Sequence, residues 1–330
     1  MMMMRRRFQN RITTISRIGI GVRVGQNQAV TVSASFRSRA TAQVWWLLGP
    51  FFLFFTVFWL VPLLGGARSS LYSNELVGTP SYVGLQHYRD LLGDARFFKA
   101  ARNTVLFTAA SVVCIVPLAL LLAQALRMTF RRTRPVLSFL LLLPGLTPPA
   151  VLALLFLLVF HGHDGLLNRV FITPLGLKPI NWLRDPAFIL AALVLQSVWR
   201  WTGFITFFVL AGMESIPATL YEAAHLETRS RWRVFFAVTL PQLRGVLLFA
   251  SVYLVVDAFS LFSGGYVLLG GSGGTADAGL LLVSYTYQQA FTFGRFGTAS
   301  AISLAIAPWL LLGLWLVFWR GGEGGRSRGR

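Results

Sequence analysis

The chain has few charged residues for its length, and this scarcity excludes most soluble folds. Only 12% of its 330 residues are charged, whereas a soluble domain averages about 25%. Hydrophobic residues make up 55% of the chain, and the mean hydropathy is +0.64. Such a composition, with several long apolar runs, is typical of a helical protein that crosses a membrane several times.

Cysteine and lysine are also scarce. Cys114 is the single cysteine, which excludes a disulfide within the chain and leaves its compartment undefined by this route. Lysine occurs only as Lys99 and Lys178, so arginine supplies most of the net charge of +19. The arginines cluster between and beside the apolar runs, as membrane topology requires. This placement argues against binding to nucleic acid.

Motifs for several kinds of chemistry are missing. A phosphate-binding loop needs Gly-Lys-Ser/Thr, but neither lysine follows a glycine, and the Gly-rich stretch Gly270–Gly274 has no lysine. His161-Gly-His163-Asp164 lacks the further ligands that a structural metal site needs and is interpreted as a polar turn. No nucleophile–base set or useful pair of carboxylates is evident. We therefore expect a non-enzymatic chain that binds no cofactor and no metal.

Six apolar runs are long enough to cross about 30 Å of hydrocarbon as helices. Tryptophans open the first run, where their amphipathic rings favour the interface. Pro117 is expected to kink the second run, and Pro144, Pro148 and Pro149 to interrupt the third. We predict an all-α, polytopic membrane protein with spans at Trp45–Leu64, Thr104–Leu126, Val136–Phe160, Phe188–Gly212, Val246–Leu269 and Thr298–Trp319.

Polar segments divide the chain further. Residues 1–40 are basic and contain no acid, so we predict a disordered arm on anionic lipid, with a targeting segment as the alternative. Residues 280–293 are expected to form a short helix outside the bilayer or partly re-entrant. The predicted parts are the arm at 1–40, a first span and outer loop at 41–102, a core of five spans at 103–320 with a central polar loop at 213–245, and a flexible tail at 321–330.

The basic residues predict the orientation of these spans. With six spans, twenty basic residues lie on one side and nine on the other, and Arg200 lies inside a span. The larger group comprises the arm, the 127–134 loop, the central loop and the tail. Because cytoplasmic loops are enriched in Lys and Arg, both termini and the central loop are predicted to be cytoplasmic.

The central loop is polar and basic, and it predicts two short helices. Ser215 would cap the first, with Pro217 in its first turn. Ser230 would cap the second, which Pro241 would stop. The predicted helices are Ala218–Glu227 and Arg231–Leu240.

Two functions fit these helices. One is docking into a partner's groove, with Glu222 meeting a basic group while the side chains of Leu220, Ala223, Ala224 and Leu226 pack. The other is an amphipathic helix on lipid, with its face of Arg229, Arg231 and Arg233 towards headgroups. The spacing alone does not decide between them.

Residues of this loop also carry a resemblance. Tyr221-Glu222-Ala223-Ala224, followed by Phe235 and Thr239-Leu240-Pro241, is similar to the E-A-A loop of permease subunits of ABC importers of the MetI-like and MalF-like type. Other stretches between about Asn103 and Pro308 resemble the carbohydrate branch of that family. They are Gly165–Asn168 with Asn181–Pro186, and Gly270-Gly271 and Thr275 with Ala290-Phe291 and Gly297–Ala301.

The resemblance implies a permease for a sugar or related polyol or glycoside in the inner or plasma membrane of a bacterium or archaeon. Its implied partners are a second, different permease subunit, two ATP-binding subunits that use ATP and Mg, and an extracytoplasmic solute-binding protein. ATPases docked on the loop would drive alternating access. The implied coupling residues are Tyr221, Glu222, Ala223, Ala224, Glu227, Thr228, Leu240 and Pro241.

The chain departs from the family at one turn. Where the family usually has Asp-Gly, this chain has Glu227-Thr228. The change removes a glycine suited to positive φ, so we expect a different turn between the two loop helices.

Two charged residues lie inside apolar runs near mid-bilayer, Arg200 in the fourth span and Asp257 in the fifth. An unpaired charge there costs about 2.5–3.5 kcal/mol. We therefore expect both to face the bundle interior as a pair, which would be either structural or part of a translocation cavity. Nearby rings that would suit a sugar-sized solute belong to Trp199, Trp201, Phe204 and Tyr253.

Two other classes of membrane protein are the alternatives. A gradient-driven secondary transporter would have more intramembrane acids and often two related halves. A membrane-embedded glycosyl transferase would have clustered acids at a membrane face. The eleven acidic residues are instead scattered, and only Asp257 lies within a predicted span.

Overall fold

The structure is a computed structural model that describes residue 46 and residues 48–73, 79–130 and 132–326. The predicted basic arm lies outside the described residues. The chain divides into two compact units, Met1–Pro62 and Leu63–Arg330. An apolar helix, Leu48–Ser69, includes the π-helical turn η1 (Thr56–Leu60) and α3 (Val61–Ser69).

In the described residues of the larger unit, the regular structure is helical apart from one two-stranded antiparallel hairpin, in which Tyr72 pairs with Tyr82. Its elements after α3 are β1 (Tyr72–Ser73), β2 (Ser81–Tyr82), α4 (Gln86–Gly93), α5 (Ala95–Met128), α6 (Arg134–Leu146), α7 (Pro149–Val159), η2 (Asn168–Ile172), η3 (Thr173–Leu175), α8 (Pro186–Glu214), α9 (Ala218–Glu227), α10 (Arg231–Val234), η4 (Phe235–Thr239), α11 (Leu240–Gln242), α12 (Arg244–Phe259), α13 (Ser263–Leu268), η5 (Thr275–Asp277), α14 (Leu282–Tyr287), η6 (Gln288–Thr292) and α15 (Phe296–Arg326).

The predicted spans correspond to single long helices or to bent pairs of helices. Among the described residues, four single helices are long and apolar enough to cross a membrane, and up to six spans result if each of two bent helix pairs counts as one. The single helices are Leu48–Ser69, Ala95–Met128, Pro186–Glu214 and Phe296–Trp315. The bent pairs are α6 with α7, at 98°, and Arg231–Gln242 with α12, at 66°.

The third span is interrupted at its prolines, as the sequence predicts, whereas the fifth is not the single helix that the sequence predicts. α6 ends at Leu146, and Thr147 is extended because the following proline disfavours helical backbone at this position. The fifth run is interrupted after Phe259, where α12 ends. A separate short helix, α13, contains Gly264 and Gly265, whose low helix propensity favours an interruption nearby.

The second and sixth spans are longer than predicted. α5 begins at Ala95, inside the expected outer loop, because the Asp94 side chain accepts a hydrogen bond of 2.8 Å from the Arg96 N–H. The helix continues through Pro117 to Met128. α15 extends to Arg326, so residues 321–326 are helical rather than a flexible tail; each further residue adds one backbone hydrogen bond.

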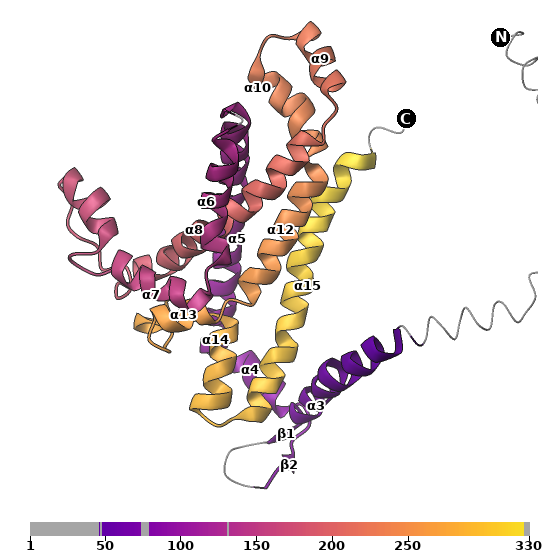
Figure 1. The fold of residues 1–330 in the computed structure, drawn as a ribbon. Coiled ribbons are helices and arrows are strands. Elements are labelled where there is room, and N and C mark those ends of the chain that lie inside the picture. The colour runs from indigo at the N-terminus through magenta and orange to yellow at the C-terminus, as the bar shows by residue number, and fades with distance from the viewer. Residues whose placement is uncertain (1–45, 47, 74–78, 131, 327–330) are drawn as a thin grey trace, which may run out of the picture. The chain divides into compact units, whose positions relative to one another are not determined.

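The core of the larger unit is a bundle of long helices. α5 packs on α8 and α12, and α12 packs on α15 (Figure 1). α9 and α10 lie at one end of this bundle, and α4 and α14 lie at the other (Figure 1). α14 with η6 is a short helical segment, as the sequence predicts for residues 280–293.

Candidate functional site

The first loop helix, α9, has the predicted bounds Ala218–Glu227 but a different start. Its N-cap is Pro217, and the Ser215 hydroxyl donates to the Gly212 carbonyl at 2.8 Å. The predicted Ser215 cap is therefore wrong. Ser215 lies two residues before Pro217, where its hydroxyl adds a second hydrogen bond to a carbonyl at the end of α8 that accepts only a long one, 3.3 Å, from the Ser215 N–H.

The second loop helix begins as predicted and ends differently. The Ser230 hydroxyl accepts a hydrogen bond of 3.4 Å from the Arg233 N–H, which confirms this cap. Helical structure then continues past Pro241 to Gln242, through the wider π-helical turn η4. A proline inside a helix lacks an N–H and crowds the carbonyl four residues earlier. The wider turn before Pro241 accommodates both effects, so the proline does not stop the helix.

Tyr221 connects α9 to two other elements. Its hydroxyl accepts a hydrogen bond from Arg127 Nη1 at 3.1 Å and lies 3.2 Å from Thr239 Oγ1. The Arg127 guanidinium also lies over the ring, 5.2 Å from its centroid. Thr239 is only 3% exposed. Tyr221 therefore links α9 to the end of α5 and to η4.

The opposite side of α9 is exposed. Glu222 and Ala223 are exposed, and Leu226 is 91% exposed. A groove of about 780 Å³ lies between α9 and the second loop helix, and its lining includes Ala224, Glu227 and Thr228. Exposed apolar side chains continue this surface on the second helix at Trp232 and Phe236. The Glu227–Thr228 turn runs through extended backbone at Thr228, so it needs no positive φ there.

An ion pair at the start of the loop was not predicted. Arg134 at the start of α6 pairs with Glu214 at the end of α8. The two residues are 80 positions apart. Opposite charges at the ends of two predicted spans were the only signal for it in the sequence.

Arg200 and Asp257 do not form the expected direct pair. Two ion pairs occur among the described residues, and neither joins them. Instead Trp201 lies between them: its Nε1–H donates to Asp257 Oδ2 at 2.6 Å, and the Arg200 guanidinium lies over its ring at 4.8 Å from the centroid. An indole offers a donor at its edge and a negative face, so one ring serves both charges.

Three of the four predicted rings lie together. Trp201, Phe204 and Tyr253 have centroids 5.1–5.6 Å apart. Trp199 is outside this cluster and is 60% exposed. Two residues along a helix turn the side chain by about 200°, so Trp199 and Trp201 face opposite sides of α8. Arg200 Nε is buried and lacks a hydrogen-bond partner among the described residues.

Comparison with known proteins gives a consistent picture. A family model described as "Binding-protein-dependent transport system inner membrane component" matches residues 115–319. The arabinooligosaccharides transport system permease protein AraP of Bacillus subtilis is 31% identical over 78% of this chain and 81% of that protein. The trehalose/maltose transport system permease protein MalF of Thermococcus litoralis is 33% identical over 75% of this chain and 83% of that protein.

A solved structure shares the fold. A chain of a bacterial ABC transporter involved in the import of the acidic polysaccharide alginate superposes with a TM-score of 0.75 and 20% sequence identity. The match covers 88% of this chain and all of the other.

Proposed function

From the premise that this chain belongs to the inner membrane components of binding-protein-dependent transport systems, we propose that it is the permease subunit of an importer for a sugar, or a related polyol or glycoside. The chain is a membrane transport subunit, and ATP hydrolysis belongs to a separate subunit. The names of the two relatives, which refer to arabino-oligosaccharides and to trehalose and maltose, support this substrate class.

The proposed assembly contains a second, different permease subunit, two ATP-binding subunits that use ATP and Mg, and an extracytoplasmic solute-binding protein. The membrane is the cell membrane of a bacterium or archaeon. Both termini and the loop 213–245 face the cytoplasm, and the distribution of basic residues supports this orientation.

The observation that carries the coupling mechanism is the position of Tyr221. α9 presents Glu222 and Leu226 outward, where an ATPase groove would hold them. On its inner side, Tyr221 joins α9 to Arg127 of α5 and Thr239 of η4. Closure of the ATPases would displace α9, and this contact would pass the displacement to the spanning helices.

The Arg200–Trp201–Asp257 arrangement would line the solute path. Its partly exposed neighbours Phe204 and Tyr253 offer ring faces, and Asp257 and Arg200 offer charged acceptor and donor groups. Ring faces combined with a few polar groups suit a solute that is apolar on its C–H faces and polar at its hydroxyls.

The test is uptake by right-side-out membrane vesicles that contain the complete transporter, with ATP in the lumen and the solute-binding protein outside. Labelled maltose and arabino-oligosaccharides are the solutes. Uptake should require ATP, stop with vanadate, and continue when ionophores collapse ion gradients. Uptake that persists without ATP and ends with the gradient would establish the secondary transporter instead, and transfer of labelled sugar to lipid would establish the glycosyl transferase.

A second experiment distinguishes docking from lipid contact for α9. Glu222→Arg should reduce the ATPase recovered with the tagged permease at least tenfold, whereas Asp164→Arg, the same charge change on the loop we place outside, should not. Unchanged ATPase recovery with Glu222→Arg would contradict the docking assignment.

A further inference from the structure

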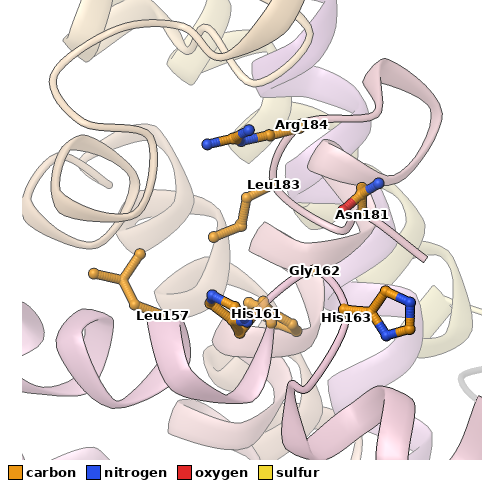
Figure 2. A pocket seen from close by; sticks show the side chains of 8 residues that line it. Leu157, His161, Gly162, His163, Asn181, Leu183 and Arg184 are labelled. Atoms are coloured by element: carbon orange, nitrogen blue, oxygen red, sulfur yellow. The ribbon is translucent and has the colours of Figure 1, made fainter. Parts of the chain in front are cut away.

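A pocket of about 410 Å³ lies between the end of α7 and the segment that precedes α8 (Figure 2). It belongs to the loop 161–186, which the basic-residue distribution places outside the membrane. The residues that line it are Leu157, Phe160, His161, Gly162, His163, Asn181, Leu183 and Arg184.

One buried side chain holds both walls of this pocket. Asn168 is 0% exposed. Its Nδ2 donates to the Gly162 carbonyl and, at 2.9 Å, to the Ile180 carbonyl. Its Oδ1 accepts from Ile180 N–H at 3.2 Å and from Trp182 Nε1–H at 3.1 Å. The turn at 161–165 is thus fixed against residues 180–182, and the pocket is built rather than formed by chance between mobile loops.

Close packing also fixes the turn at 161–165. A Cβ on Gly162 would lie 2.4 Å from Asn181 Oδ1, and one on Gly165 would lie 2.4 Å from the His161 carbonyl oxygen. At Gly165 backbone atoms leave no room for a side chain, whereas at Gly162 a Cβ would have to displace the Asn181 carboxamide. The wall that carries His161 therefore keeps a defined distance from the wall that carries Arg184.

The charge of the pocket is positive. Arg184, Leu183 and His161 lie around one opening, with Leu157 beside them, whereas the His163 ring points away (Figure 2). No acidic residue lines the pocket. The neighbouring Asp185 is engaged at the N-terminus of α8, where it accepts from the Ala187 N–H at 3.0 Å. Within the described part of the chain, Arg184 forms no ion pair.

The lining argues against a sugar or a metal ion. A sugar site would offer an exposed ring face, but Phe160 is 1% exposed, and its ring packs at 5.1 Å from Phe156 and 6.1 Å from Trp182. The described residues contain no group of three His, Cys, Asp or Glu side chains that could hold a metal ion. A carboxylate fits better, because a guanidinium binds it through two parallel hydrogen bonds and an imidazole adds a third donor.

We propose that this pocket receives an acidic side chain of the extracytoplasmic solute-binding protein. The inference rests on the proposed function, which brings that protein to this face. Arg184 would bind the carboxylate, His161 would flank it, and Leu157 and Leu183 would shield the contact from water. The charge of the pocket would then both orient the incoming protein and fix its register.

The test uses the complete transporter in nanodiscs of zwitterionic lipid and the solute-binding protein of the same importer, with affinity measured by biolayer interferometry. Arg184→Glu should weaken binding at least tenfold and Arg184→Gln at least threefold, and Arg184→Lys should restore most of the affinity. Lys178→Glu is the matched control, because Lys178 is an exposed cation on the same loop outside the pocket; it should change affinity less than twofold. The wild-type affinity should fall with added salt more steeply than that of Arg184→Gln.

Three outcomes would overturn the assignment. Equal binding by wild type and Arg184→Glu would show that the pocket takes no part in docking, although the importer function would stand. In a parallel measurement with anionic lipid added to the purified transporter, weaker lipid retention by Arg184→Glu than by wild type, with docking unchanged, would assign the pocket to a lipid headgroup. If the wild-type transporter bound no solute-binding protein, the proposed function would fail and the pocket proposal with it. The melting temperature of each variant confirms that it is folded.

Discussion

Tyr221 is the residue through which the loop helix α9 contacts a spanning helix. Its partner Arg127 is 94 positions earlier in the chain, and Thr239 is 18 positions later. The sequence identifies the tyrosine through its place beside Glu222, but it cannot identify the partners. These contacts arise only when α5 and η4 are brought to the same place by the packing of the bundle.

Tyr221→Phe should weaken coupling without preventing assembly. The variant loses the hydroxyl that accepts from Arg127, while the ring beneath the guanidinium remains. One such hydrogen bond contributes about 1 kcal/mol, so ATP-driven uptake should fall about fivefold. Uptake per assembled transporter is the measurement. Tyr82→Phe, on an exposed strand at the other end, is the control and should transport normally.

Arg200→Ala and Asp257→Ala should each abolish uptake and leave the assembly with its partners largely intact. Each removes one of the two charges that Trp201 separates. Co-purification of the partners together with solute uptake provides the measurement. If both variants transported normally, neither charge would belong to the solute path.

Apolar patterning predicted the position of both charges inside spans but not the tryptophan between them. Whether the Trp201 indole contacts Arg200 and Asp257 depends on how α8 is rotated about its axis relative to α12. The same rotation places Trp199 outside the cluster. Helical period alone would have separated Trp199 from Trp201, but it does not say which of the two faces inward.

The contact between α6 and α8 depends on a glycine. A Cβ on Gly203 would lie 1.6 Å from the Leu141 carbonyl oxygen, so the two backbones approach as closely as they can. α6 contains no fully buried side chain. The close approach at Gly203, the partly buried Leu141 and the Arg134–Glu214 ion pair together hold α6 on α8.

Gly203→Ala should destabilise the protein, because α6 and α8 must separate to admit the methyl group. Overpacking of this kind costs about 1–3 kcal/mol, which should appear as a lower melting temperature in detergent. Gly245→Ala on α12 has open space at its Cβ and serves as the control. A variant of Gly203 with unchanged stability would show that this contact is not close in the protein.

An ion pair holds the loop before α14. Arg96 donates two hydrogen bonds of 2.8 Å to the Asp277 carboxylate, and Lys99 donates to the Ala276 carbonyl. Ala276 and Asp277 have φ values of 52° and 54°, which are uncommon for residues with a side chain. The ion pair stabilises a backbone conformation that these residues rarely adopt unaided.

The same pair predicts a dependence of stability on pH. The hydrogen bond from Arg96 lowers the pKa of Asp277 below its usual value. Its stabilising contribution is therefore present above about pH 4, the unfolded value, and is lost as the pH falls through the lower folded value. The difference in melting temperature between wild type and Asp277→Asn should shrink as the pH is lowered from 7 towards about 3. A constant difference would contradict the role of the charge.

Chain composition and apolar run length predicted the helical membrane fold, and the helix-forming residues between Pro217 and Thr228 predicted the bounds of α9, because both depend on local sequence. The sequence predicted an interruption at the prolines between α6 and α7, but it did not predict the bend of 98°. Proline shows where a helix can break, whereas the direction after the break is set by tertiary contacts. α7 packs against α13, which lies more than a hundred residues later.

The orientation of the whole chain can be tested with its single cysteine. Cys114→Ala removes it and gives a background for Glu222→Cys and Lys178→Cys, both at exposed positions. A membrane-impermeant maleimide should label residue 178 in intact cells and residue 222 only after the membrane is opened. Labelling of residue 222 from outside would contradict the proposed topology.

The 66° angle between Arg231–Gln242 and α12 determines how a displacement of the loop would reach α12. When two rigid helices meet at such an angle, a displacement along the axis of one would move the other mainly sideways. α12 would then tilt rather than move along its own axis. In the proposed mechanism, this motion would keep Asp257 at its own depth in the bilayer while the end of α12 next to the loop moves, so the solute path would change its access without carrying a charge through hydrocarbon.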